Sequence, residues 1–388
     1  MGRAVAIIGT GQTRYGRRSE VSYPELVRES VNAAFTDASI SPKDIGGIVS
    51  GTMPSLMEGV SLTHLYFADA LCGAEKPTLK VETCGSTGMS LAHAGYYWVS
   101  SGMADIVMVV GMEKMFEGDG QATMSSAFDP FFQRTFAAGA PGTFTLQVME
   151  WMNRFNIDEQ KARDAAALVS VSNRENAMDN PYAHIRTRVT VEDVKNSKII
   201  SYPVRLLDVC PQSDGACAVI FASEEKAKKI CKKPAWVKAV SYIGESYFAG
   251  ECDVAVWPSA TEAARRAYSQ AGISDPLKEI DLAEIYNPFT YQEMLFYECF
   301  GFCPRGEAPD YVLKGTFTRK GQLPCGMSGG TLCANAIGAA GLARVAEGAL
   351  QICGKAGARQ IDQAKLALTH AMGGVNQFNG FMLLADKL

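Results

Sequence analysis

Residues 81–95 read VETCGSTGMSLAHAG, in which a β-branched residue leads into a cysteine and small residues then open a helix. A similar stretch, GMSGGTLCANAIGAAG, occupies residues 326–341. Each stretch precedes a run typical of a buried strand, IVMVVG at 106–111 and LALTH at 366–370. Continuous apolar strands that alternate with helices indicate sheets buried on both faces, so we predict an α/β fold.

A second pair of related segments extends this repeat. Residues 33–51 read AAFTDASISPKDIGGIVSG, and residues 266–289 contain RAYSQAGISDP and IDLAEIYNPF. Each pairs an Ala-rich helix end with an Ile-Ser turn, a proline and a buried strand. We therefore predict a duplicated fold, with an N-terminal half at 1–240 and a C-terminal half at 241–388. A fortuitous likeness of two α/β segments is the alternative.

The stretch from about 114 to 200 is richer in charged and aromatic residues and poorer in strand periodicity than the rest. We predict that it forms an inserted loop domain within the N-terminal half. A long insertion in a compact enzyme often covers the binding site.

The composition excludes several classes of protein. Of the 388 residues, 47% are hydrophobic and 20% are charged, and the net charge is −4, which gives no reason to expect a nucleic-acid partner. No apolar segment is long enough to span a bilayer, so we expect no membrane anchor and no signal peptide. The 11 cysteines lack zinc-site spacing and only 4 histidines occur. We therefore expect reduced thiols, a cytoplasmic location and no bound metal.

Cys84 is the candidate nucleophile. A thiol at a helix N-terminus lies at the positive end of the helix dipole, which favours the thiolate. The glycines around it let a substrate carbonyl approach the backbone. A buried core cysteine in a tight strand–helix turn is the alternative.

The chain resembles the thiolases along essentially its whole length. The motifs that carry the resemblance are TCGS at 83–86, SGMAD at 101–105, GMEKM at 111–115, SDGA at 213–216, NPF at 287–289, LPCGMSGG at 323–330 and HAMGG at 370–374. The lysine after Gly-Met-Glu and the histidine before the last glycine pair are more similar to the archaeal and sterol-carrier types. The resemblance implies a five-layered α-β-α-β-α fold and a homodimer. It also implies a small partner subunit with a zinc ribbon and an OB fold, as some archaeal types have.

The resemblance further implies a two-step acyl transfer with coenzyme A as a substrate and no permanently bound cofactor. A cysteine thiolate attacks the β-keto carbon of a β-oxoacyl-CoA, and the shorter acyl-CoA leaves as an enolate. Free CoA then takes the acyl group from the cysteine. This chemistry needs a nucleophile, an acid/base near the leaving carbon and donors for two oxyanions.

The sequence departs from the family's pattern at the nucleophile. The family's cysteine is followed by two small residues and then glycine, whereas one extra residue separates Cys84 from Gly88. Counting back from Gly111 places Gly85 in the nucleophile's position. Either the helix start has a one-residue insertion and Cys84 attacks, which we favour, or the nucleophile is absent.

The expected catalytic histidines also differ. The histidine of the family's Gly-His-Pro segment is replaced by Asn335, whose amide donates to an oxyanion but cannot act as a base. His370, at a strand end, is the candidate general acid/base, with a packed core histidine as the alternative. Ala371 stands where many relatives carry a second cysteine or an asparagine, which leaves that role open.

Tyr286 and Asn287 fall in the strand-end motif that orients a water or a thioester oxygen in the family. Backbone N–H groups of Cys84 and of the Gly373-Gly374 pair, Gly374 above all, are the candidate donors to the other oxyanion. Tight packing is the alternative role for these glycines.

Met115, Phe128 and Phe132 of the insertion are candidates for a pocket that takes a bulky or aromatic acyl group, with a plain hydrophobic core as the alternative. Benzoylsuccinyl-CoA is one substrate that such a pocket suits. We therefore predict a β-oxoacyl-CoA thiolase. A condensing synthase fits poorly with one such histidine, and a non-catalytic acyl-CoA-binding or scaffold subunit is the main alternative.

Overall fold

A computed structural model describes residues 2–53, 59–60, 62–134, 139–247 and 249–388. The main feature of this part of the chain is a mixed sheet of nine strands. In sheet order the strands are β3 (Thr78–Lys80), β2 (Gly47–Gly51), β4 (Ile106–Lys114), β7 (Asp214–Ser223), β1 (Val5–Gln12), β8 (Ala235–Gly244), β11 (Phe378–Ala385), β10 (Leu366–Gly373) and β9 (Leu282–Glu284). A separate hairpin joins β5 (Ile199–Ser201) to β6 (Val204–Arg205).

The sheet consists of two related halves. The successive pairs in the series β2, β4, β7 and β1 are parallel, antiparallel and antiparallel, and the pairs in the series β9, β10, β11 and β8 follow the same order. A parallel bridge from Cys325 to Ala283 takes the place of β3 in the second half. The halves join where β1 pairs with β8 at only two positions. The strand order confirms the predicted duplication, and the division at residue 240 stays a prediction.

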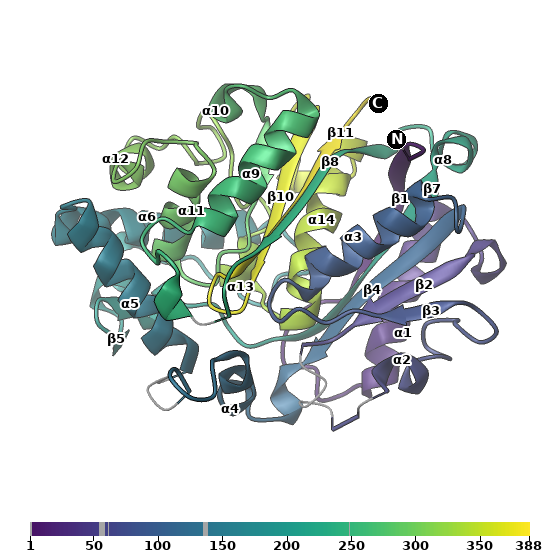
Figure 1. Ribbon diagram of the computed structural model, residues 1–388, viewed down its shortest axis with the longest axis horizontal. Coiled ribbons are helices and arrows are strands. Elements are labelled where there is room, and N and C mark those ends of the chain that lie inside the picture. The colour runs from purple at the N-terminus through teal and green to yellow at the C-terminus, as the bar shows by residue number, and fades with distance from the viewer. Residues whose placement is uncertain (1, 54–58, 61, 135–138, 248) are drawn as a thin grey trace.

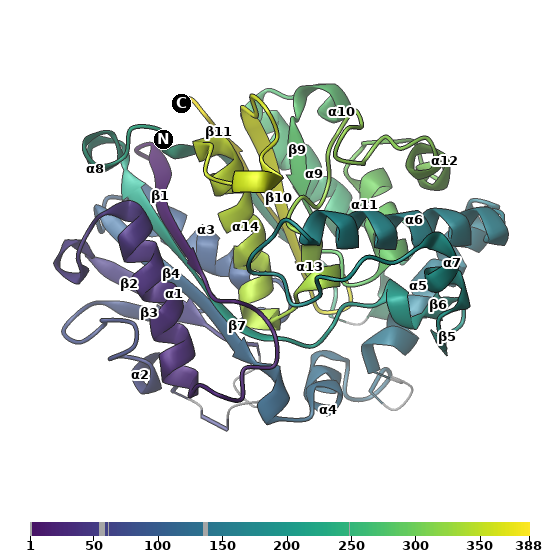
Figure 2. The same ribbon diagram turned by 180° about the vertical axis from the view of Figure 1, so that it is seen from behind.

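Helices separate and cover the two halves of the sheet in five layers (Figures 1 and 2). On the outer side of the first half, α1 (Tyr23–Ala38) packs on β1 and β7. Between the halves, α3 (Thr87–Ser100) packs against α14 (Ile337–Cys353). On the far side, α9 (Pro258–Ala271) covers β8 and β11. The predicted α-β-α-β-α arrangement is confirmed.

The small residues that open both repeated helices allow the middle layer to form. A Cβ at Gly88 would lie 2.2 Å from the backbone nitrogen of Leu342, and one at Gly341 would lie 3.0 Å from that of Met89. The backbones of α3 and α14 therefore touch. Nearly every residue of α14 is buried, including Arg344 and Glu347, whose charges are paired with Glu284 and Arg359.

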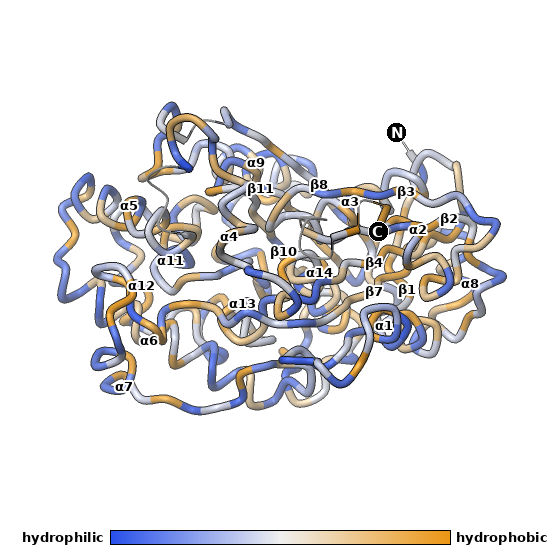
Figure 3. Tube along the Cα trace, turned by 90° about the horizontal axis from the view of Figure 1, so that it is seen from below, coloured by the Kyte–Doolittle hydropathy of each residue, from blue (hydrophilic) through white to orange (hydrophobic). Residues whose placement is uncertain are grey.

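The stretch predicted as an insertion is largely helical, and residues 135–138 within it lie outside the described part. It contains α4 (Gly120–Met124), α5 (Gly139–Arg154), α6 (Glu159–Ala177) and α7 (Val191–Asn196). Helix α4 lies at the lower end of the molecule in Figure 1, so it lies toward the viewer in Figure 3, which is seen from below.

Shorter helices complete the described chain. They are α2 (Thr63–Tyr66), α8 (Glu224–Ile230), α10 (Pro276–Glu279), α11 (Thr290–Cys299), α12 (Ala308–Leu313) and α13 (Gly330–Cys333). None of the helices in the described ranges is long and apolar enough to cross a membrane.

Candidate active site

A cavity lies at the carboxyl ends of β4, β9 and β10, the edge where α/β sheets commonly bind ligands. Met115 lines it just after β4, Tyr286 just after β9, and Met372 and Gly374 at the end of β10. Cys84 lines it from the turn before α3. The lining is otherwise mostly apolar, which suits an acyl group more than a charged ligand.

The turn at Cys84 has an unusual backbone. Cys84 has a φ of 58°, in the left-handed region that residues other than glycine rarely adopt, and such residues concentrate at functional sites. Helix α3 begins at Thr87, three residues further on, and the Thr87 N–H donates to the carbonyl of Cys84 at 2.9 Å. The cysteine thus precedes the helix instead of lying in its first turn.

The surroundings of the thiol correct one prediction. Burial raises the pKa of the Cys84 thiol, although the backbone N–H groups of Gly374 and Gly85 act in the opposite direction. The prediction that the helix N-terminus lowers this pKa is therefore wrong, because desolvation outweighs the nearby donors. The contact with the Gly374 N–H does bring the predicted oxyanion donor beside the predicted nucleophile.

Position 85 has no room for a side chain. A Cβ there would lie 2.7 Å from the carbonyl oxygen of Met372 and 3.3 Å from the hydroxyl of Tyr286. The position that motif counting assigns to the nucleophile is therefore filled by its neighbours. Cys84 is the thiol that this turn presents to the cavity, and its role as nucleophile stays a prediction.

A hydrogen-bonded chain crosses the cavity wall. The Tyr286 hydroxyl donates to Oδ1 of Asn335 at 3.2 Å, and Nδ2 of Asn335 donates to Sγ of Cys210 at 3.2 Å. Ser213 fixes the backbone of Asn335 from both sides, with bonds of 3.1 Å to its N–H and its carbonyl. All three members of the chain line the cavity.

Sequence reasoning predicted Tyr286 and Asn335 but missed Cys210. A signal for it existed, because Cys210 lies three residues before the SDGA motif at 213–216. Among the described residues that line the cavity, the ionisable side chains are Cys84, Cys210 and Tyr286. Any proton transfer by this lining must therefore use a thiol or a phenol.

The structure places His370 elsewhere. Its side chain is fully buried on β10, hydrogen-bonded at 3.0 Å to Asn379 and in contact with the rings of Phe296, Phe300 and Phe381. Burial lowers its pKa to about 3, so the imidazole is neutral near neutral pH. His370 does not line the cavity. The prediction that His370 is the general acid/base is wrong, and the alternative of a histidine packed in the core is correct.

Asn287 also lies outside the lining. Its Oδ1 accepts from the N–H of Thr331 at 2.7 Å, and its Nδ2 donates to Glu293 at 2.7 Å. Asn287 therefore joins the segment after β9 to α13 and is not among the residues that line the cavity. Gly373 has a packing role, because a Cβ there would lie 2.5 Å from the carbonyl oxygen of Thr83.

Of the three residues predicted to form the acyl pocket, two line the cavity and one does not. Met115 and Phe128 are 2% and 3% exposed and line the cavity. Phe132 is 64% exposed and does not line it, so its prediction as a pocket residue is wrong.

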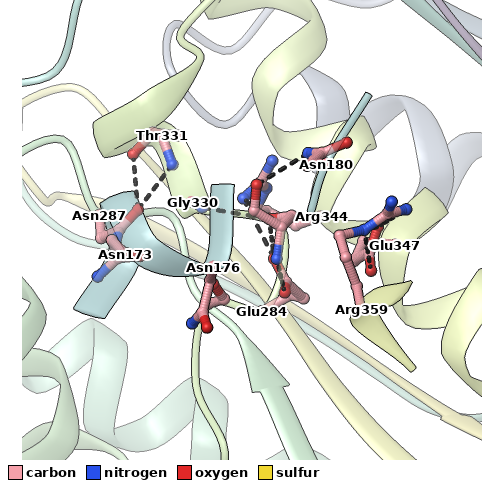
Figure 4. A network of polar contacts seen from close by, with 12 residues as sticks. Asn173, Asn176, Asn180, Glu284, Asn287, Gly330, Thr331, Arg344, Glu347 and Arg359 are labelled. Atoms are coloured by element: carbon pink, nitrogen blue, oxygen red, sulfur yellow. Dashed lines mark hydrogen bonds and ion pairs between the residues drawn. The ribbon is translucent and has the colours of Figure 1, made fainter. Parts of the chain in front are cut away.

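A buried polar network holds the loop that leads to Asn335 (Figure 4). Asn176 of α6 and Asn180, three residues beyond the end of α6, donate to the carbonyls of Gly326 and Ser328 at 3.1 and 2.8 Å. Glu284 accepts from the N–H of Ser328 at 3.0 Å and pairs with Arg344 at 3.1 Å. These contacts position the loop backbone before it reaches the cavity.

The duplicated fold and the cavity at the carboxyl ends of its strands are those of an α/β enzyme, and comparison with known proteins gives the family. Residues 5–225 match the thiolase N-terminal domain, and residues 245–386 match the thiolase C-terminal domain-like family. The chain is 32% identical over 378 residues to an acetyl-CoA acetyltransferase of Methanothermobacter thermautotrophicus, with 96% of this chain and 97% of that protein covered. The chain therefore belongs to the thiolase family.

Two further relatives bear on the function. The benzoylsuccinyl-CoA thiolase subunit BbsB of Thauera aromatica is 28% identical over 376 residues, covering 96% of this chain and 95% of that protein. A solved structure described as an Ltp2-ChsH2(DUF35) aldolase superimposes with a TM-score of 0.85 at 25% identity. That match covers 99% of this chain and 98% of the solved chain.

Proposed function

We propose that the protein cleaves a β-oxoacyl-CoA with free CoA through an acyl thioester on Cys84. The observation that carries this proposal is the turn at Cys84. The backbone of Cys84 has a left-handed conformation there, its thiol faces an apolar cavity, and the Gly374 N–H lies beside the thiol. Coenzyme A is a substrate in this scheme, and no permanently bound cofactor takes part.

The neighbouring groups suit the charges that develop. The N–H groups of Cys84 and Gly374 are the proposed donors to the oxyanion that forms when the thiolate adds to the β-keto carbon. The Asn335 amide, in the position of the family's histidine, is the proposed donor to the thioester oxygen through the second N–H of Nδ2, because the first donates to Cys210.

The proposed acyl group is bulky or aromatic, with benzoylsuccinyl-CoA as the test substrate. In support, Phe128 and the flexible side chains of Met53, Met115 and Met124 line the cavity, and methionines adapt to irregular ligands. The cavity volume of about 80 Å³ is smaller than the roughly 150 Å³ that holds a benzene molecule. Binding of an aromatic acyl group therefore requires the methionine side chains to move. If acetoacetyl-CoA is the best substrate in a panel, a bulky or aromatic acyl group is ruled out.

We also propose a homodimer that works in the cytoplasm with a small zinc-ribbon and OB-fold subunit. In support, a protein of similar structure is described as a complex with a DUF35 subunit. Co-expression with such a subunit, followed by light scattering on the purified complex, tests this assembly. A chain that remains alone at micromolar concentration would contradict it.

Aldol cleavage of a β-hydroxyacyl-CoA is a second candidate. It needs a base at the hydroxyl and an acid at the α-carbon, but no covalent nucleophile. The observation that favours it is the Tyr286 hydroxyl, which lies where a side chain at position 85 would extend, in a cavity whose described lining has no histidine.

Peptide mass mapping separates these functions. The protein is incubated with a panel of β-oxoacyl-CoA and acyl-CoA esters, beside Cys84→Ala and a control, Cys231→Ala, whose thiol lies outside the cavity lining. An adduct on the Cys84 peptide, lost only in Cys84→Ala, supports the thiolase. Carbonyl release from a β-hydroxyacyl-CoA without an adduct supports the aldolase. CoA-ester binding with neither result supports a non-catalytic binding subunit.

A further inference from the structure

The reaction needs a proton donor that the predicted residues do not supply. When the C–C bond breaks, the electron pair stays on the α-carbon of the leaving CoA ester, and this enolate must be protonated. His370 is outside the cavity, and Ala371 has no proton to give. With Cys84 as the nucleophile, the remaining ionisable side chains among the described lining residues are Cys210 and Tyr286.

The hydrogen bonds through Asn335 distinguish these two candidates. The Tyr286 proton is already directed at Oδ1 of Asn335. Cys210, in contrast, accepts from Nδ2 of Asn335, which uses a lone pair of the sulfur and leaves its S–H proton available. The same amide N–H would stabilise the thiolate after the proton has left.

We propose that Cys210 is the acid that protonates the α-carbon of the leaving CoA ester, with Asn335 as its positioning residue. This assignment rests on the proposed C–C cleavage. It applies to the thiolase and to the aldolase alike, because both release the same kind of enolate.

The proton balance closes over one thiolase cycle. The Cys84 thiol first loses its proton to solvent, the thiolate adds to the β-keto carbon, and the C–C bond breaks with its electron pair on the α-carbon. The Cys210 S–H protonates that carbon and becomes a thiolate. This thiolate then takes a proton back from solvent, while the incoming CoA thiol gives its proton to solvent and its sulfur attacks the acyl group on Cys84. The C–S bond to Cys84 breaks, which restores the Cys84 thiolate.

The environment of Cys210 suits this role. Burial raises the pKa of Cys210 to about 12, while the Asn335 amide acts in the opposite direction. The side chain is therefore a neutral thiol at neutral pH, as an acid must be before it acts. An ester enolate is a much stronger base than a thiolate, so the transfer is downhill.

Hydrogen exchange at the α-carbon measures this step directly. Acetyl-CoA is incubated in D₂O with the protein and with Cys210→Ala, Cys210→Ser, Cys84→Ala and the control Cys231→Ala, and deuterium in the acetyl group is followed by NMR. Acylation of Cys84 by acetyl-CoA is followed in parallel by mass spectrometry. We expect Cys210→Ala and Cys210→Ser to lose about 10²-fold or more in exchange, the typical contribution of a general acid, and to keep the acylation. Serine fills the space without the acidity, so its equal loss distinguishes proton transfer from packing.

Each other result has a defined meaning. Exchange within twofold of the unchanged protein in Cys210→Ala, or no exchange by the unchanged protein, overturns the assignment. Loss of acylation together with exchange shows a structural role for Cys210 and also overturns it. If no cysteine is acylated even in the unchanged protein but exchange depends on Cys210, the thiolase proposal fails and the assignment stands.

Discussion

The two halves of the fold deliver their central helices to the cavity on loops that are built differently. The turn before α3 is held by its own hydroxyls, since Ser86 donates to the carbonyl of Thr83 at 2.8 Å and Thr83 bonds to Ser90 at 2.7 Å. The loop at 326–336 before α14 is instead held from outside by Asn176 of α6, by Asn180 just after α6 and by the Glu284–Arg344 pair.

The difference follows from the backbone of each loop. Gly326, Gly329 and Gly330 all have positive φ values, so this loop forms no regular ladder and its buried carbonyls need side-chain donors. The turn at Cys84 is short enough for neighbouring hydroxyls to satisfy it. The first repeat therefore presents a thiol on a turn that is held by its own hydroxyls. The second presents Asn335 from a buried polar platform, formed by Asn176, Asn180, Glu284 and Arg344 (Figure 4).

The largest expected effect comes from breaking the ion pair under the 326–336 loop. Arg344→Met leaves the Glu284 carboxylate buried without its cation, which costs about 3–5 kcal/mol in the free energy of unfolding. Urea unfolding at neutral pH measures it. The double variant Glu284→Gln/Arg344→Met should recover part of the loss, because no charge is then left unpaired. A single variant as stable as the unchanged protein would contradict this account of the platform.

Removing one asparagine of the platform should have a smaller effect. Asn176→Ala leaves the buried carbonyl of Gly326 without its donor, at a cost on the order of 1–3 kcal/mol. The matched control is Asn153→Ala on the exposed face of α5, which should change stability little. Equal losses in both variants would show that the loop does not depend on Asn176.

The pH dependence of stability tests the structural role of His370. Its pKa falls from an ordinary 6.5 to about 3 on folding, so between these values the unfolded chain binds more protons and acid favours unfolding. From pH 7 to pH 5 this one group should remove about 2 kcal/mol of stability.

His370→Phe should lose this part of the pH dependence while it keeps the aromatic packing. Urea unfolding of both proteins at pH 7 and at pH 5 measures the loss of stability in each. The difference between the two losses is the contribution of His370, separated from that of other groups. The pH profile of turnover should keep its shape. A change in that profile would return His370 to the catalytic machinery and contradict its placement in the core.

His370 and Cys210 show what the sequence could and could not predict. Apolar periodicity and the repeated helix openings predicted the duplicated layers, because those patterns reflect burial directly. The sequence motifs also pointed to Cys84, Tyr286, Asn335 and Gly374, which line one cavity in the structure. The predicted catalytic role of His370 was wrong because the alternation of side chains along a strand decides which face of the sheet each one occupies. A sequence motif does not contain that information. Cys210 was missed because its partner, Asn335, is 125 residues away in the chain.

The smallest expected effect concerns the hydroxyls of the Cys84 turn. Ser90→Ala removes the partner of the Thr83 hydroxyl, but that hydroxyl also accepts from Ser86, so the cost should be only about 0.5–1.5 kcal/mol. Because the turn carries Cys84, its loosening should slow acylation of Cys84 more than it lowers stability. Asn176→Ala should show the reverse order, since it acts on the opposite loop. Acylation rates and unfolding free energies measured on both variants decide this, and the same ranking in both would mean that the two loops respond as one unit.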